Sequence, residues 1–386
     1  ILKLGFHRKS YVKWKNFPKS FLPFSDAASN QLPLVRLLQL SLFQVSVGIG
    51  VVLLVGTLNR IMIVELGVSA AIVAMMVALP LLVAPFRAFV GFRSDTYKSV
   101  LGWRRVPFIW VGSLLQFGGL CIMPFALILL SGDTHWPLWI GPLSAGLAFL
   151  LVGMGVQTVQ TAGLALATDL SPDLNKPRVV ALMYTMLLLG MVISSLVIIF
   201  LLEPFSQVRL IQVIQGTALI CFLLNLVALW KQEPRNVVLT SPKKQSPSFW
   251  FCWKKFSKTP NTKRFLLALG VGTAAFSMQD VILEPYGGEI LKLSVSETTL
   301  LTAYSTCGSI ISFGFAAWFL KTNINSHRIA GLGAVLGILA FSFVVLSEPM
   351  ASIFLFFLGV FLIGCGAGFF SVSCLLSAMK LEVDGF

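Results

Sequence analysis

The sequence between two long apolar runs reads Gly91-Phe-Arg93-Ser-Asp95-Thr-Tyr-Lys98-Ser-Val-Leu-Gly102-Trp-Arg104-Arg105. The flanking runs, 67–90 and 107–130, are each long enough to cross a bilayer, which takes about 20 apolar residues. A short loop that packs one Asp, two Gly and four cations between two spans is unusual. We therefore expect this loop to have a defined structure that fixes the fold around it.

The composition predicts a helical integral membrane protein. Of 386 residues, 56% are hydrophobic and only 11% are charged, whereas soluble domains average about 25% charged residues. The apolar runs are continuous rather than alternating, which favours membrane helices over a membrane β-barrel. Ten candidate spans follow, at about 37–58, 67–90, 107–131, 138–168, 178–202, 208–230, 264–283, 297–320, 328–347 and 351–379.

The cations predict the orientation and explain the net charge of +14. All but three of the 29 Lys and Arg fall on one side of these spans, and the three exceptions are Arg60, Arg209 and Lys292. An excess of Lys and Arg marks the cytoplasmic side, or the stromal side in a plastid. The charge therefore needs no nucleic acid as partner, and anionic lipid headgroups are its expected secondary contact.

Neither an enzyme nor a metal protein is expected. The six Cys contain no Cys-x-x-Cys pair, so neither a zinc site nor a disulfide framework is supported. No Walker loop and no nucleophile–base arrangement is found in the sequence. The three His lie in tails or at helix ends.

The loop 91–105 resembles the loop that joins helices 2 and 3 in the major facilitator superfamily. The resemblance implies an all-α membrane fold of two pseudo-symmetric six-helix bundles, of which this chain would hold about ten of twelve helices. The expected organisation is a basic N-terminal segment (1–35), an N-terminal bundle (36–230), a basic amphipathic linker (231–263) and a C-terminal bundle (264–386). The linker alternates Lys pairs with Trp250, Phe251, Trp253 and Phe256, which suits a membrane-interface segment or a partner-docking surface.

Two polar clusters lie on the basic side. The first contains Gly91, Asp95, Gly102, Arg104 and Arg105, and we expect it to act as a conformational latch or structural clasp between helices, where Asp95 pairs with Arg or accepts bonds from helix amides across the boundary between the bundles. Plain positive-inside charge is the alternative.

The second basic-side cluster contains Asp169, Asp173 and Arg178. It is expected to be a salt-bridged loop of little energetic weight, with Lys176 and Arg178 reaching the two Asp.

Two further sets suggest a binding site. Asp280 is the only carboxylate clearly inside an apolar run, so it is a functional candidate unless water already reaches it at the helix end. Glu284-Pro285 is expected to break the helix and Gly287-Gly288 to form a tight turn.

A polar stripe lies on the fourth span. Gln157, Gln160 and Thr161 share one helix face. With Gln44 and Ser46 of the first span they could line a central cavity, or they could only bond helices together.

Five motifs together resemble the PucC/LhaA family, the chlorophyll-transporter branch of the superfamily. They are Arg93-Ser-Asp95-Thr, Gly102-Trp-Arg-Arg-Val-Pro107-Phe-Ile, Ala167-Thr-Asp169-Leu, Pro177-Arg-Val-Val-Ala-Leu-Met-Tyr184 and Gln279-Asp-Val-Ile-Leu-Glu-Pro-Tyr-Gly-Gly288. The last is the most specific, because nothing in a generic transporter requires Asp-x-x-x-Glu-Pro-Tyr-Gly-Gly.

The resemblance implies a role in light-harvesting complex assembly and a location in a photosynthetic membrane: a thylakoid, or a bacterial intracytoplasmic or inner membrane. Expected ligands are chlorophyll or bacteriochlorophyll, with carotenoid and lipid as further candidates. Expected partners are antenna or photosystem subunits and chlorophyll-synthesis enzymes. An axial ligand to the pigment Mg is expected from Gln157, Gln160, Gln279 or Glu284, with Asp280 and Tyr286 as further pigment or substrate contacts.

Three functions stay open at this point. The first is a pigment carrier or assembly factor, which suits abundant Phe and sparse internal charge. The second is a transport-inactive scaffold bound to a photosystem or a pigment-synthesis enzyme, because the proton relay of a symporter is missing. The third is a small-solute facilitator, which the fold alone permits.

Overall fold

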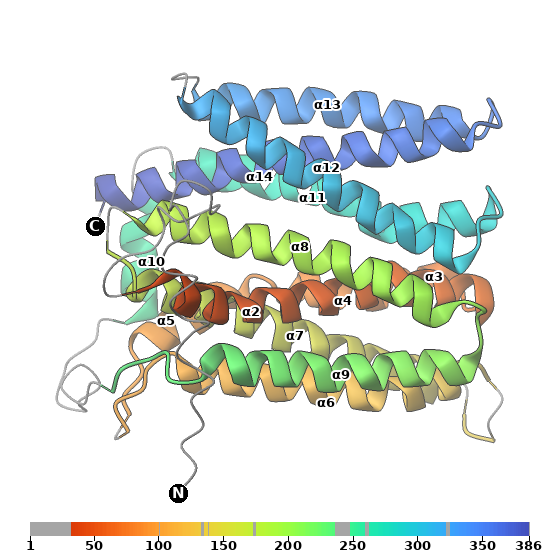
Figure 1. Ribbon diagram of the computed structural model, residues 1–386, viewed down its shortest axis with the longest axis horizontal. Coiled ribbons are helices and arrows are strands. Elements are labelled where there is room, and N and C mark those ends of the chain that lie inside the picture. The colour runs from red at the N-terminus through yellow and green to blue at the C-terminus, as the bar shows by residue number, and fades with distance from the viewer. Residues whose placement is uncertain are drawn as a thin grey trace, which may run out of the picture.

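The computed structural model describes residues 32–99, 101–132, 135–137, 139–172, 175–235, 248–258, 262–321 and 325–385. Within these ranges the regular structure is helical, and ten helical stretches are long and apolar enough to cross a membrane. They run roughly parallel, and α10 (Phe249–Lys258) lies across their direction at one end of the bundle (Figure 1). The all-α fold of long apolar helices is therefore confirmed.

The first span is longer than its apolar run predicts. It runs from Leu34 to Glu65 and combines α2 (Leu34–Val51), a π-helical segment η3 (Val52–Thr57), α3 (Leu58–Arg60) and a second π-helical segment η4 (Ile61–Glu65). π-helical turns are rare and are frequently found at functional sites, so the region around Gly56 is a candidate for such a site.

The second span is divided by its prolines. It consists of α4 (Ala70–Val83) and α5 (Phe86–Asp95). Pro85 lacks an N–H, and the amides of Ala84 and Arg87 bond three residues back instead of four. The division places the basic end of this span on a separate short helix, from which the loop 96–105 continues.

The rest of the N-terminal half consists of α6 (Val106–Leu130), α7 (Ile140–Asp169), α8 (Lys176–Leu202) and α9 (Gln207–Leu229). Pro107 and Pro177 stand in the first turns of α6 and α8, where their missing N–H costs no helical bond. Helices α6 and α7 cross closely: a Cβ on Gly155 would lie 2.4 Å from the backbone N of Gln116.

The second half contains α11 (Thr262–Glu289), α12 (Val295–Lys321), α13 (Ser326–Ser347) and α14 (Ile353–Gly385). It packs on the first half mainly where α12 lies along α8. The two halves occupy the upper and lower parts of Figure 1.

The predicted break at Glu284-Pro285 is wrong, because α11 continues through Pro285, Gly287 and Gly288 to Glu289. The turn follows at Lys292, whose φ is +56°. One proline removes a single donor, and a helix tolerates this where another group takes over the freed carbonyl.

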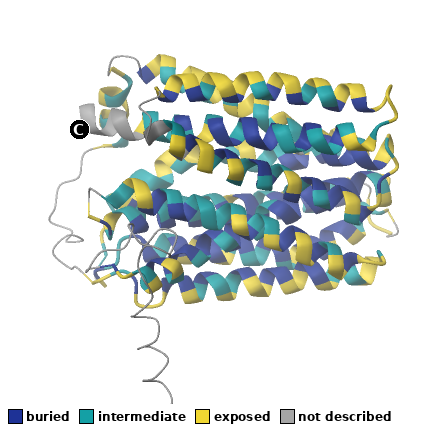
Figure 2. Ribbon diagram, turned by 45° about the horizontal axis from the view of Figure 1, so that its top comes forward, coloured by how far each residue is buried: buried dark blue, intermediate teal, exposed yellow. Residues whose placement is uncertain are grey.

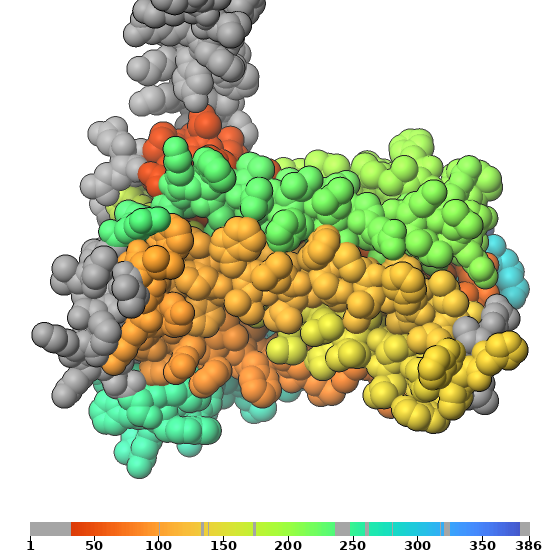
Figure 3. All heavy atoms as spheres, turned by 90° about the horizontal axis from the view of Figure 1, so that it is seen from below, coloured from red at the N-terminus to blue at the C-terminus, as the bar shows by residue number. Residues whose placement is uncertain are grey.

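Burial follows the membrane environment. Buried side chains gather between helices, and exposed apolar ones cover the outer faces, as on α13 (Figure 2). Apolar outer faces are what a lipid solvent requires, because lipid tails are as apolar as Leu. In the described chain α10 has no buried residue, and the space-filling view shows the segment around it projecting beyond the neighbouring spans (Figure 3).

Parts of the predicted organisation fall outside the described residues. These include residues 1–31 of the basic N-terminal segment, and residues 236–247 and 259–261 of the linker, with Lys243 and Lys244 among them.

Candidate functional site at the junction of the two halves

The first contact between the halves is made possible by a proline. Pro285 has no N–H to donate to the carbonyl of Val281 four residues earlier. The side-chain amide Nδ2 of Asn59, on α3 of the first span, donates to this carbonyl oxygen at 3.1 Å. The proline therefore gives the first span a backbone acceptor to bind, and α11 stays helical.

The second contact is a buried arginine. Arg60 is 4% exposed. Its Nη1 pairs with Oε1 of Glu65 at 2.5 Å, and its Nη2 donates to the carbonyl of Leu293 beyond α11 at 3.3 Å. A Cβ on Gly288 would lie 3.2 Å from Nε of Arg60, so the small residue at 288 leaves room for the guanidinium.

The third contact brings three helices together around a carboxylate. Glu284 of α11 is 5% exposed, and its Oε1 accepts a hydrogen bond from the hydroxyl of Thr302 on α12 at 2.7 Å. Gly56 of η3 lies against both, because a Cβ there would be 2.8 Å from Oε1 of Glu284 and 2.9 Å from Oγ1 of Thr302.

A cavity of about 180 Å³ adjoins this carboxylate. One wall is polar. Thr302, Ser305, Thr306 and Ser309 of α12 lie on one helix face at i, i+3, i+4 and i+7, and Gln279 and Glu284 come from α11. The Oε1 of Gln279 is buried and has no hydrogen-bond partner among the described residues. The remaining lining is apolar and comes from α2, η3, α8 and α14, together with Leu283 of α11 and Leu301 of α12.

The cavity can bind a polar group but does not enclose a pigment ring in this structure. Sites for drug-sized molecules are about 300–1,000 Å³, so about 180 Å³ is too small for a chlorin macrocycle. A carboxylate and an amide oxygen can accept hydrogen bonds or supply one oxygen ligand to Mg. In the described residues no group of three or more His, Cys, Asp or Glu is placed to hold a metal ion.

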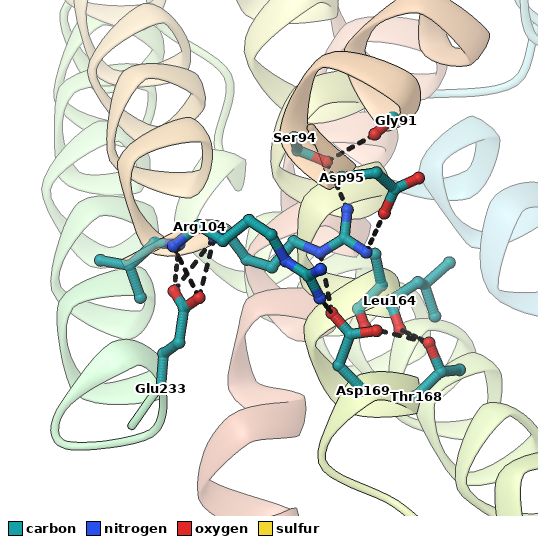
Figure 4. Close-up of polar contacts among 11 residues, drawn as sticks. Gly91, Ser94, Asp95, Arg104, Leu164, Thr168, Asp169 and Glu233 are labelled. Carbon is teal, nitrogen blue, oxygen red and sulfur yellow. Dashed lines mark hydrogen bonds and ion pairs between the residues drawn. The ribbon is translucent and has the colours of Figure 1, made fainter. Parts of the chain in front are cut away.

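The loop 91–105 forms a separate polar cluster at the basic end of the bundle (Figure 4). The side chain of Arg105 is only 5% exposed and pairs with Asp95 of α5 and with Asp169 of α7, the latter at 2.9 Å. It also donates to the hydroxyl of Ser94 at 2.6 Å. Arg104 shares Asp169 at 2.6 Å but is 29% exposed, and Gly102 has a φ of +79°, which glycine adopts without strain.

A residue outside the predicted cluster binds the helix amides. Both carboxylate oxygens of Glu233, four residues beyond α9, accept from the backbone N–H groups of Arg104, Arg105 and Val106 at 2.7–3.1 Å. A carboxylate at a helix N-terminus satisfies orphan donors and complements the helix dipole.

The predicted pairing of Asp95 with an Arg, as a clasp between helices, is confirmed by its ion pair with Arg105 just before α6. The alternative, in which Asp95 accepts bonds from helix amides across the boundary between the bundles, is not seen among the described residues, because Glu233 accepts those bonds. Asp95, Asp169 and Ser94, which bind Arg105, lie in the N-terminal bundle, and Glu233 follows α9 at the start of the linker. In this structure the loop is a clasp within one half.

Asp169 differs from its prediction as well. Its ion pairs are with Arg104 and Arg105, more than 60 residues away in sequence, and not with the cations of its own loop. Chain proximity suggested Lys176 and Arg178, but the packing of α7 against α5 and α6 brings the other loop closer. Asp173 lies outside the described residues.

The stripe on the fourth span does not line this cavity. Thr161 accepts from Nε of Arg87 at 3.0 Å, and the buried Oε1 of Gln157 has no partner in the described chain. Gln160 is half-buried and does not line the cavity. Because α7 packs on α4, α5 and α6, its polar face does not reach the walls formed by α11 and α12.

The two polar residues of the first span are also elsewhere. Ser46 hydrogen-bonds Gln116, which contacts Asn225 at 3.5 Å. Gln44 is fully buried, and neither atom of its amide has a partner in the described chain.

The last two predicted residues are on α11. Tyr286 packs its ring against Phe356, with centroids 5.7 Å apart. Asp280 lies in the helix next to Val281, and its side chain lies outside the described residues. The prediction that Asp280 is the only carboxylate inside an apolar span is wrong, because Glu284 is buried in the same helix.

Sequence reasoning missed Asn59, Arg60, Glu233 and the hydroxyl face of α12. The hydroxyl face could have been found, because its four residues recur at helical spacing. Asn59 and Arg60 were missed because the predicted span ended at 58, whereas the helix continues to Glu65.

Comparison with known proteins identifies the family. The sequence profile of the PUCC protein family matches residues 57–386. The chain belongs to the PucC family. It is 51% identical to Protein PucC of Cereibacter sphaeroides over 94% of this chain and 79% of that protein. It is 52% identical to Protein PucC of Rhodovulum sulfidophilum over 93% and 81%.

One more distant relative of this PucC family member is not itself named PucC. The "Bacteriochlorophyll synthase 44.5 kDa chain" of Rhodobacter capsulatus is 26% identical over 91% of this chain and 80% of that protein.

Solved structures show that the fold of this PucC family member is that of major facilitator transporters. The nucleoside transporter NupG matches with a TM-score of 0.61 and 16% identity over 89% of this chain and 82% of that one. The xylose transporter XylE from E. coli matches with a TM-score of 0.61 and 13% identity over 90% and 86%. Identities this low establish the fold alone.

Proposed function

We propose that this protein binds or delivers (bacterio)chlorophyll and assists the assembly of light-harvesting or photosystem complexes. It does so without catalysis, as an integral protein of a photosynthetic membrane with its basic side in the cytoplasm or stroma. Membership of the PucC family supports the proposal. The observation that carries it is that the most specific motif, 279–288, supplies the buried Glu284 and the half-buried Gln279 to the lining of the cavity between the halves.

The cavity residues would bind a polar part of the pigment, since the ring itself exceeds about 180 Å³. Oε1 of Gln279 is a buried acceptor with no partner in the described chain, so an oxygen ligand is available to a pigment Mg without breaking an existing bond there. The hydroxyls of α12 are donors to pigment carbonyl groups. The exposed apolar faces of the helices outside the cavity would contact the apolar ring and tail of the pigment.

The test is the absorption spectrum and pigment content of gently solubilised protein from its photosynthetic host. Wild-type protein should retain (bacterio)chlorophyll, and Glu284→Gln and Gln279→Leu should each lower the pigment per chain. Glu348→Gln, at an exposed carboxylate after α13, is the matched control and should retain it. Preparations reproducibly free of pigment and of antenna or photosystem partners would refute the proposal.

A transport-inactive scaffold is the second candidate, and the small cavity favours it. Its binding surface would be α10, where Trp250 and Phe251 are 72% and 65% exposed. In a pull-down, Trp250→Ala with Phe251→Ala should then release antenna, photosystem or pigment-synthesis partners while Glu284→Gln keeps them. Release by Glu284→Gln alone would rule the scaffold out.

A further inference from the structure

A second hollow lies on the outer surface, away from the site between the halves. It is a groove of about 340 Å³ between α8 and α9, with Val45 and Ile49 of α2 as its floor. Its sides extend from Gly190 to Leu201 on α8 and from Arg209 to Ile220 on α9. Exposed Ile193, Val197 and Ile220 border it, so it faces the lipid.

The length of the groove matches one leaflet. The eleven residue steps from Arg209 to Ile220, and the eleven from Gly190 to Leu201, each correspond to about 16 Å of helix. Half of the hydrocarbon core of a bilayer is about 15 Å. A single acyl chain that enters at the membrane surface would reach the end of the groove near the bilayer centre.

The groove is charged at its surface end only. Arg209 lies in the first turn of α9, and its Nη1 donates to the carbonyls of Glu203 and Pro204 at 2.6 and 3.1 Å. Those acceptors are neutral, and none of the ion pairs found among the described residues involves Arg209. Arg209 therefore makes no ion pair within the described chain, although Glu203 lies in the same turn, and it lies at the end of the spans that holds few cations.

We propose that this groove is a binding site for one anionic phospholipid of the leaflet on the cation-poor side. One acyl chain lies between α8 and α9, and the phosphate pairs with Arg209. The proposal is independent of the pigment function.

Gly216 offers a way to fill the groove without disturbing the fold. A Cβ at Gly216 would meet no atom within 4 Å, and the same holds for Gly331 on the exposed face of α13. Gly216→Leu therefore blocks the groove, and Gly331→Leu is the matched control for adding Leu to a lipid-facing glycine. Arg209→Gln removes the charge alone.

The test uses vesicles of phosphatidylcholine that contain photoactivatable phosphatidylglycerol with a diazirine on the acyl chain. Crosslinked peptides are mapped by mass spectrometry. Wild type and Gly331→Leu should concentrate crosslinks in 190–220, and Gly216→Leu should lose that concentration. Arg209→Gln should lower labelling about fivefold at low salt, since one cation near the surface contributes about 1 kcal/mol. With a phosphatidylcholine probe it should make little difference.

Three results would overturn the inference. Crosslinks spread evenly over all lipid-facing helices in wild type would show that no site exists. Unchanged labelling in Gly216→Leu would place the lipid elsewhere. Purified protein that holds pigment in place of phospholipid, with the pigment lost in Gly216→Leu, would assign the groove to a different occupant. Thermal melting of each variant separates these outcomes from misfolding.

Discussion

Pro285 removes one hydrogen-bond donor from α11, and Asn59 replaces it at the carbonyl of Val281. Asn59→Leu should leave this acceptor unsatisfied and cost about 1–3 kcal/mol of stability. Pro285→Ala returns the helical N–H, so Asn59→Leu should cost less than about 1 kcal/mol in that background. Denaturant unfolding in detergent micelles measures the double-mutant cycle. If the losses of stability in the two single variants add up to that of the double variant within about 0.5 kcal/mol, Asn59 does not replace the missing N–H of residue 285.

Arg105 and Arg104 provide a second comparison at this scale. Arg105 is buried and binds Asp95, Asp169 and Ser94, whereas Arg104 is more exposed and, among the described residues, its side chain pairs with Asp169. Lys cannot reproduce a forked guanidinium contact. Arg105→Lys should therefore lower stability by about 2 kcal/mol or more, and Arg104→Lys by less than about 1 kcal/mol. If thermal unfolding gives the same loss of stability for Arg105→Lys and Arg104→Lys, burial does not make the contribution of Arg105 larger than that of Arg104.

At the scale of elements, the crossing of α6 and α7 depends on a missing side chain. A Cβ at Gly155 would lie 2.4 Å from Gln116 N and 2.6 Å from Gly112 O, both backbone atoms that cannot rotate away. Gly155→Ala should cost about 1–3 kcal/mol. Gly118→Ala in α6, where a Cβ meets nothing within 4 Å, should be neutral or slightly stabilising. The melting temperatures of Gly155→Ala and Gly118→Ala test this prediction. Similar melting temperatures would mean that α6 and α7 move apart at little cost in stability.

At the scale of the whole molecule, Gly56, Asn59 and Arg60 of the first span contact the second half. We predict that these contacts close the cavity on the cation-poor side. Gly56→Leu should force the first span away from Glu284 and Thr302. In a cysteine-free background, Ser309→Cys should then become labelled by an impermeant thiol reagent added from the cation-poor side.

Without Gly56→Leu the same cysteine should stay unlabelled from that side. Gly314→Leu, placed where a Cβ has open space, is the control and should also stay unlabelled. Labelling from the cation-poor side in the unmodified background would contradict a closed end.

Much of the fold could be predicted. Apolar runs located all ten spans, and Pro107 and Pro177 located helix starts, because these signals are local. Helix ends that depend on partners could not be predicted: the first span continues to Glu65 and α11 passes through Pro285. Asn59 of the first span binds the carbonyl that Pro285 leaves without a donor, and Gly288 of α11 leaves space for Arg60. Each helix therefore continues past the end predicted for it.

Sequence alone determined that this chain is a helical membrane protein, how its cations are distributed across the membrane, and to which family its motifs point. These properties depend on composition and on local sequence patterns, because hydropathy and the positions of Lys and Arg determine how segments partition into a bilayer. Only the tertiary structure decided that Arg105 clasps a single half, that Glu233 binds the amides of α6, and that Glu284 faces Thr302 rather than the glutamines of α7. Those pairings join residues far apart in the chain, and helix packing, not spacing, selects which polar groups meet.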